Sequence, residues 1–242
     1  HYVLILSLHD LHQRNGDVSR CIDFVNKSPR VYNLRSNLCH CFLALAMGRG
    51  SQGLLDLETH FSFYGAYHST PGNILLHTLF VWPLLFSVLM ILYIIPPFID
   101  LDWKTYGVVV NVGFVVSLFY SVFYILLDKR AGVLASFLCF GCWIGANLTS
   151  ETLGSSLSWK VALITQGVCW SGLFIGHAVF EGRAPALFDN LIQAFLTAPF
   201  FVLLEVLQSV FGYEPNPGFH TRVKTRTESE IKRWRNERKV KL

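Results

Sequence analysis

Long apolar stretches separated by short polar segments dominate the chain after residue 70. Four of them approach the roughly 20 residues that a helix needs to cross the hydrocarbon core of a bilayer. These stretches cover residues 74–95, 106–127, 131–148 and 161–180. Helices are the expected form, because a helix pairs its own backbone polar groups where no water is available. The pattern therefore predicts an all-α polytopic membrane protein with four transmembrane helices.

Two further segments flank these stretches. Residues 54–68 carry apolar and aromatic side chains at helical spacing, and "STPG" follows at once, so we predict an N-terminal amphipathic helix that ends there. Residues 191–211 are largely apolar, but they contain Gln193, Glu205 and Gln208, with Pro199 in the middle. A full span would carry the basic end of the chain across the bilayer. We therefore predict a re-entrant or interfacial helical hairpin bent at Pro199.

Composition supports the membrane class. Of the 242 residues, 52% are hydrophobic and only 15% are charged, and the mean hydropathy is +0.42. A soluble domain carries about 25% charged residues. A large soluble module is therefore excluded.

Positive charge is concentrated at the end of the chain. Residues 221–242 hold nine Lys or Arg and three Glu, a net charge of +6, against −2 for the remainder. The positive-inside rule puts this segment, together with Lys129 and Arg130, on the cytosolic side, and the loops at 96–105 and 149–159 on the other side. Anionic membrane lipid is the partner that such a segment can meet. Nothing else supports binding to nucleic acid, and none is expected.

The chain is expected to have three parts. Residues 1–46 have mixed polarity and precede the first methionine, Met47, so we interpret them as an extension outside the native fold. Residues 47–218 form the membrane-embedded catalytic domain. Residues 219–242 form a basic cytosolic tail, for which a solvated helix is the simplest structure.

The predicted topology brings three histidines to one membrane depth. His68 and His77 flank the entrance to the first span, and a Pro-Gly turn between them lets the two side chains converge. His177 ends the fourth span on the same side, and Glu181 follows at i+4 on the same helical face. Imidazoles plus a carboxylate, with open coordination positions, suit a non-haem Fe(II) site that holds O2. We therefore predict that these four residues are metal ligands and catalytic residues.

Other interpretations of these residues stay open. A single histidine at a membrane interface is usually only hydrogen-bonded, and His60 is an alternative fourth ligand. The spacing of "CFGC" at 139–142 is typical of a redox motif, but its apolar surroundings favour small buried side chains. Ser171 and His177 are six residues apart, about 600° around a helix, which argues against a serine hydrolase.

Two motifs resemble a known family. "FYGAYHSTPGNILLH" at 63–77 and "GHAVFEGRAPALFDNLIQAFLTAPFF" at 176–201 closely resemble the 2-hydroxy-fatty-acid dioxygenases of the endoplasmic reticulum of fungi and plants. The resemblance covers roughly residues 54–212. It implies an endoplasmic reticulum membrane enzyme that uses Fe(II) and O2. It also implies a long-chain 2-hydroxy fatty acid as substrate, shortened by one carbon in phytosphingosine breakdown.

The resemblance also bears on individual residues. The histidines and the glutamate of the family fall on His68, His77, His177 and Glu181. For the substrate we predict contacts from Arg183, Asn73 and Asn190, of which Arg183 is suited to pairing with a carboxylate. Arg183 can equally anchor the helix end to lipid phosphate, and Asn73 can be a helix N-cap.

Two rival functions remain at this point. A non-catalytic lipid-binding or scaffolding protein predicts no bound metal. A different metal-dependent membrane lipid enzyme, such as a zinc hydrolase, predicts turnover without O2. The sequence gives no indication of the oligomeric state.

Overall fold

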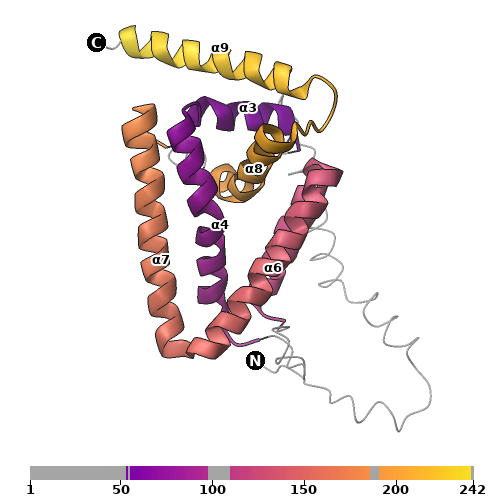
Figure 1. The fold of residues 1–242 in the computed structure, drawn as a ribbon, viewed down its shortest axis with the longest axis vertical. Helices are drawn as coiled ribbons and strands as arrows, with labels where there is room; N and C mark the ends of the chain where they lie inside the picture. Colours follow the sequence, from indigo (N-terminus) through magenta and orange to yellow (C-terminus); the bar gives the residue numbers. More distant parts are fainter. Residues whose placement is uncertain (1–52, 54, 98–109, 186–190, 241–242) are drawn as a thin grey trace, which may run out of the picture. The chain divides into compact units, whose positions relative to one another are not determined.

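The structure, a computed structural model, describes residues 53, 55–97, 110–185 and 191–240. The elements of this part of the chain are helices, so the all-α class is confirmed (Figure 1). In chain order they are α3 (Leu57–Tyr67), α4 (Pro71–Tyr93), α5 (Val112–Leu127), α6 (Lys129–Leu153), α7 (Ser155–Ile175), the π-helix η2 (Gly176–Glu181), α8 (Leu191–Phe211) and α9 (Phe219–Val240). The predicted extension at 1–46 and the start at Met47 lie outside the described residues.

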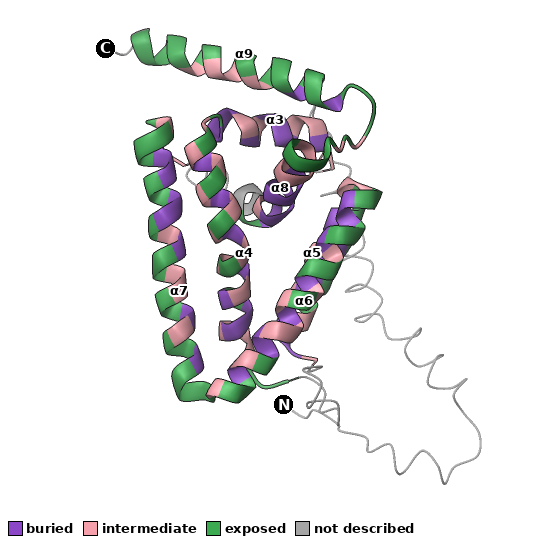
Figure 2. Cartoon of the chain, viewed as in Figure 1, coloured by how far each residue is buried: buried purple, intermediate pink, exposed green. Residues whose placement is uncertain are grey.

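Three of these elements are long and apolar enough to cross a membrane. They are α4, α6 and the continuous helix Ser155–Glu181 formed by α7 and η2. Large side chains on their outer faces, such as Phe137 and Ile164, are 74% and 68% exposed, as expected of helices that face lipid (Figure 2). The second predicted stretch forms the shorter helix α5, which begins at Val112 because the Asn111 side chain caps it. With 16 residues, α5 is about 24 Å long, so the count of four spans stays a prediction.

Very short turns connect α5, α6 and α7. Asp128 alone separates α5 from α6, and Gly154 alone separates α6 from α7. The predicted loop at 149–159 is therefore wrong: only Gly154, with φ of 70°, interrupts the helices. Glycine adopts this left-handed conformation without strain. The Ser158 hydroxyl then donates to the Ser150 carbonyl at 3.0 Å across the turn.

Two glycines bring α7 and η2 close to α4. Gly172 and Gly176 are four residues apart, the spacing of close helix pairs in membranes. A Cβ atom at Gly172 would lie 2.3 Å from the Phe80 ring, and one at Gly176 would lie 2.4 Å from Oδ1 of Asn73. The absence of these side chains therefore sets the distance between the two helices.

The predicted hairpin at 191–211 is wrong, because α8 is one helix that continues through Pro199. Proline has no amide proton, so the carbonyl of residue 195 loses its usual helical partner. The Tyr120 hydroxyl donates to this carbonyl at 3.2 Å, and the Tyr124 hydroxyl donates to that of Leu196 at 3.0 Å. These contacts satisfy the backbone at the proline, so the helix does not need to fold back.

Both ends of α8 lie near the same end of the bundle. Its first turns contact Tyr120 and Tyr124 in the last turns of α5. Just beyond its other end, the Tyr213 hydroxyl donates to Asp128, which links α5 and α6, at 2.6 Å. Between them, Phe200 and Phe201 are almost fully buried. Helix α8 is thus a core element at this end.

Helices α3 and α9 cover this end, with α3 beneath α9 (Figures 1 and 2). Glu58 of α3 forms ion pairs with Arg222 at 2.8 Å and Arg226 at 3.2 Å. The Thr227 hydroxyl donates to the Ser62 carbonyl at 3.2 Å. The basic segment is therefore a helix packed on α3. The division of the chain into a membrane-embedded domain that ends at residue 218 and a separate tail stays a prediction.

Candidate metal centre

His68 lies at the end of α3, directly before the turn into α4. Its Nδ1–H donates to the Tyr64 carbonyl at 2.8 Å, and its ring stacks on that of Tyr64 with centroids 4.0 Å apart. Burial, together with the neighbouring His77 and His177 rings, lowers the pKa of His68 well below its ordinary value. The imidazole is therefore neutral at pH 7, the form that binds metals.

His77, in the second turn of α4, is held in the same way. Its Nδ1–H donates to the Asn73 carbonyl at 3.0 Å, one turn earlier. A carbonyl can only accept, so Nδ1 carries the proton in both His68 and His77, and Nε2 carries the lone pair. Backbone contacts of this kind fix the tautomer and the ring orientation of metal-binding histidines.

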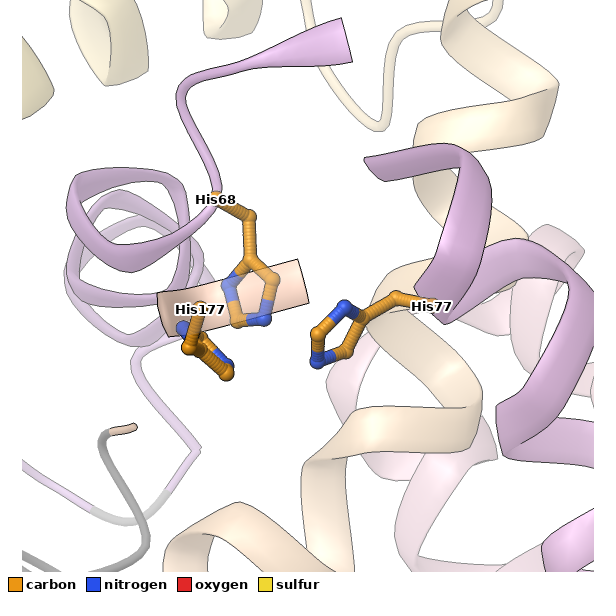
Figure 3. A group of neighbouring side chains, drawn as sticks. All are labelled: His68, His77 and His177. Carbon is orange, nitrogen blue, oxygen red and sulfur yellow. The ribbon is translucent and has the colours of Figure 1, made fainter. Parts of the chain in front are cut away.

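His177 comes from η2, which continues α7 toward the same end. The three imidazoles face one another, and one ligand nitrogen from each lies within 4.8 Å of the others (Figure 3). The ring centroids are 4.1 Å apart for His68 and His77, and 4.9 Å apart for either of these and His177. All three side chains are buried. The structure thus brings together three of the four predicted ligands.

The donor set fits a metal ion. Nε2 of His68 and Nδ1 of His177 are buried without a hydrogen-bond partner among the described residues. Buried polar atoms nearly always have such a partner. Metal–nitrogen distances of about 2.0–2.1 Å hold two ligands of one ion roughly 3–4 Å apart, so small ring movements suffice. Imidazole nitrogens suit transition metals such as iron and zinc.

Glu181 lies outside this group of three. Its carboxylate accepts hydrogen bonds from the backbone amides of Ser69 at 2.7 Å and Thr70 at 2.8 Å, and from both hydroxyls at 2.8 and 2.9 Å. These residues form the turn between His68 and α4. The i+4 argument assumed α-helical geometry, whereas residues 176–181 form the wider π-helix. Glu181 therefore joins η2 to the start of α4.

Two of the residues predicted to bind substrate, Arg183 and Asn73, make contacts between segments of the chain. The Arg183 guanidinium stacks 3.5 Å from the Tyr67 ring and donates to the Ala66 carbonyl at 3.3 Å, so it joins η2 to α3. Asn73 is fully buried inside the first turn of α4, where it donates to the Tyr67 carbonyl at 3.0 Å. It is not an N-cap, because Thr70 holds that position. Asn190 lies outside the described residues.

An apolar cavity of about 290 Å³ adjoins the three histidines. Its walls come from α3, α4, α5, α7 and α8, and His60 is also part of the lining. Sequence reasoning missed Gln166 and Tyr120 in this lining, because no local pattern marks them. It also missed the glycine pair 172 and 176, which the G-x-x-x-G spacing indicates.

Comparisons with known proteins identify the family. The sequence model of the Mpo1-like family, described as 2-hydroxy-palmitic acid dioxygenase Mpo1-like, matches residues 54–210. The chain belongs to the Mpo1-like family. A relative in Saccharomyces cerevisiae, the 2-hydroxy-palmitic acid dioxygenase MPO1, is 34% identical over 180 residues, which are 74% of this chain and 92% of the relative. No solved structure matches the chain.

The family resemblance seen in the two motifs is thus confirmed. The residues matched by the Mpo1-like family contain the three histidines, Glu181 and the walls of the cavity. They end before α9 begins at Phe219. The candidate metal centre therefore lies within the residues that the family model matches.

Proposed function

We propose that this protein is an iron-dependent dioxygenase of the endoplasmic reticulum membrane. Its substrate is a long-chain 2-hydroxy fatty acid, which it converts with O2 to the acid one carbon shorter in phytosphingosine breakdown. The observation that carries this proposal is the convergence of three buried imidazoles beside an apolar cavity. The activity for which the yeast relative is named, 2-hydroxy-palmitic acid dioxygenase, supports the substrate class.

The reaction balances without a separate reductant. The bond between C1 and C2 of the 2-hydroxy acid breaks, C1 leaves as CO2, and C2 becomes the new carboxyl carbon. O2 takes up four electrons, three from C2 and one from C1, and one water is released. The 2-hydroxy fatty acid and O2 therefore suffice as reactants.

The residues of the chain contribute orientation and shielding. His68, His77 and His177 are the proposed ligands of Fe(II), and the Tyr64 and Asn73 carbonyls hold two of these rings in the ligating tautomer. Bound iron would supply the redox chemistry that joins O2 to the substrate. Helices α3 and α8 cover the group, which limits the access of water.

We further propose that the end bearing this group and α9 faces the cytosol. Lys129, Arg130 and the basic helix α9 lie at that end, as the positive-inside rule requires of a cytosolic face. Anionic lipid of the same leaflet is the proposed membrane partner of α9.

Replacement of one ligand tests the proposal. We expect His177→Ala to lose bound iron and at least about 100-fold in formation of the shortened acid. The control is His220→Ala, which removes an exposed histidine of α9 and is expected to keep both the bound iron and the activity. Iron is measured by elemental analysis and the product by mass spectrometry, with Fe(II) added. Wild-type turnover under anaerobic conditions would indicate a hydrolase, and wild-type protein without metal would indicate a scaffold.

A further inference from the structure

Two parallel rows of side chains line the cavity away from the three histidines. On α4 the row runs from His77 through Val81 and Leu85 to Val88. On η2 and α7 it runs from His177 through Trp170 to Gln166. Each row spans eleven residues, or about 16 Å at 1.5 Å per residue. The cavity therefore extends from the candidate metal centre along the length of two neighbouring helices.

At the far end of the cavity lining, a hydrogen-bonded bridge joins α7 to α4. Nε2 of Gln166 donates to the Leu84 carbonyl at 3.2 Å and to the Ser87 hydroxyl at 3.0 Å. Its Oε1 accepts from the Trp170 indole at 2.9 Å. Because these hydrogen bonds occupy both the nitrogen and the oxygen of its amide, Gln166 joins α7 to α4 and leaves no unpaired polar group toward the cavity.

Helix α5 supplies the third wall at this end. The Cβ position of Gly113 lies 3.6 Å from Leu89, which places the start of α5 beside the end of α4. Val116 follows about one turn later and lines the cavity close to the level of Val88. One turn further along α5, Tyr120 also lines the cavity, and its hydroxyl donates a hydrogen bond to the carbonyl of residue 195.

The side chains of the walls suit a ligand that has a metal-binding group at one end and an apolar chain at the other. The histidines gather at one end, whereas aliphatic and aromatic carbon surrounds the remaining length. An alkyl chain advances roughly 1.25 Å per carbon, given C–C bonds of about 1.52 Å, so about 16 Å accommodates about 13 carbons. A fatty acid with its carboxyl end at the histidines has this form.

We propose that this cavity binds the alkyl chain of the substrate, and that Val88, Val116 and Gln166 at its far end set the preferred chain length. The proposal rests on the proposed function for the identity of the head group. With the carboxyl carbon and C2 at the histidines, the preferred acid has about 14 to 16 carbons.

A matched pair of adjacent valines tests the length limit. Val116 lines the cavity, whereas Val115 beside it is exposed on the outer face of α5. In lipid nanodiscs, full-length Val116→Phe is expected to prefer acids about three carbons shorter than the wild type does. Its kcat/KM for the longest wild-type substrate should fall at least about tenfold. Val115→Phe keeps the wild-type profile. The same profile for both variants would overturn the proposal and leave the proposed function intact.

A second measurement does not depend on turnover or on a variant that folds. Unhydroxylated C16 fatty acids that carry a photoreactive diazirine either near the methyl end or near the carboxyl end are cross-linked to wild-type protein. The methyl-end probe should label the peptides that contain Val88, Val116 and Gln166. The carboxyl-end probe should label α3 and the first half of α8. Identical labelling by the two probes would contradict the proposal. If the probes label different peptides but the protein does not turn over 2-hydroxy fatty acids, only the proposed function is contradicted.

Discussion

The carboxylate of Glu181 accepts four hydrogen bonds from Ser69 and Thr70 at 2.7–2.9 Å. Oε1 lies 3.4 Å from the Asn73 amide as well. These partners directly follow His68 in the chain and begin the helix that carries His77. Glu181 follows His177 on η2. A single carboxylate therefore fixes the position of the His177 segment relative to those of the other two histidines.

Substitution of Glu181 separates a positioning role from a ligand role. We expect Glu181→Ala to lower both iron retention and activity about 10- to 100-fold, as loss of an outer contact to a metal site does. Glu181→Gln keeps an acceptor for the two backbone amides and should retain most of the iron. Elemental analysis of the purified variants measures this. Loss of iron from Glu181→Gln as complete as that from His177→Ala would instead support the ligand role expected from the i+4 spacing.

At the scale of the helices, close approach of α4 to α7 and η2 depends on glycine. The side chain of Asn73 occupies the space that a Cβ at residue 176 would need, 2.4 Å from its Oδ1. Asn73 is fully buried, and its carbonyl holds His77, so it has little freedom to move. A larger residue at 176 must push the two helices apart, and with them His77 and His177.

Two glycine substitutions near each other in the chain test this contact. Gly176→Ala is expected to destabilise the protein by about 1–3 kcal/mol through overpacking. Gly167→Ala is the control, since nothing lies within 4 Å of a Cβ at that position of α7. Because alanine favours helix over glycine, the control should be neutral or stabilised by up to about 1 kcal/mol. Thermal unfolding in detergent measures both, and equal stability of the two variants would refute the close-contact argument.

At the scale of the whole described region, α9 braces the end that carries the metal centre. Glu58 pairs with Arg222 and Arg226, and Arg183 lies 5.0 Å from the Trp234 ring. The arginines of the ion pairs are about half exposed, so each pair contributes about 0–1 kcal/mol and weakens in salt. Much of the remaining attachment is packing, in which Phe219 and Val223 are buried.

Limited proteolysis tests this attachment. The double substitution Arg222→Ala with Arg226→Ala is expected to speed cleavage within residues 219–240 several-fold, and to remove the salt dependence of that cleavage. Lys224→Ala, an exposed change on the same helix, should cleave like the wild type. If the double variant is as resistant as this control, the ion pairs do not hold α9 in place.

Local pattern was sufficient for several features of this protein. The apolar stretches predicted α4, α6 and α7, because a helix depends mainly on residues within a few turns of one another. The end of α3 before Pro71 followed from turn residues. The order of the stretches also predicted that His68, His77 and His177 meet at one end, since successive helices in a bundle alternate in direction.

Only the tertiary structure decided the features that depend on distant partners. Glu181 contacts Ser69 across 112 positions of the chain, and α8 continues through Pro199 because two tyrosines of α5 bind its carbonyls. The basic segment packs on α3 through Glu58, 164 positions from Arg222. Hydrophobic periodicity says which face of a helix is buried, but not which side chain from another helix will meet it. The amino-acid sequence alone therefore determined the helices and the end at which the histidines lie, whereas packing between helices decided which polar groups pair there.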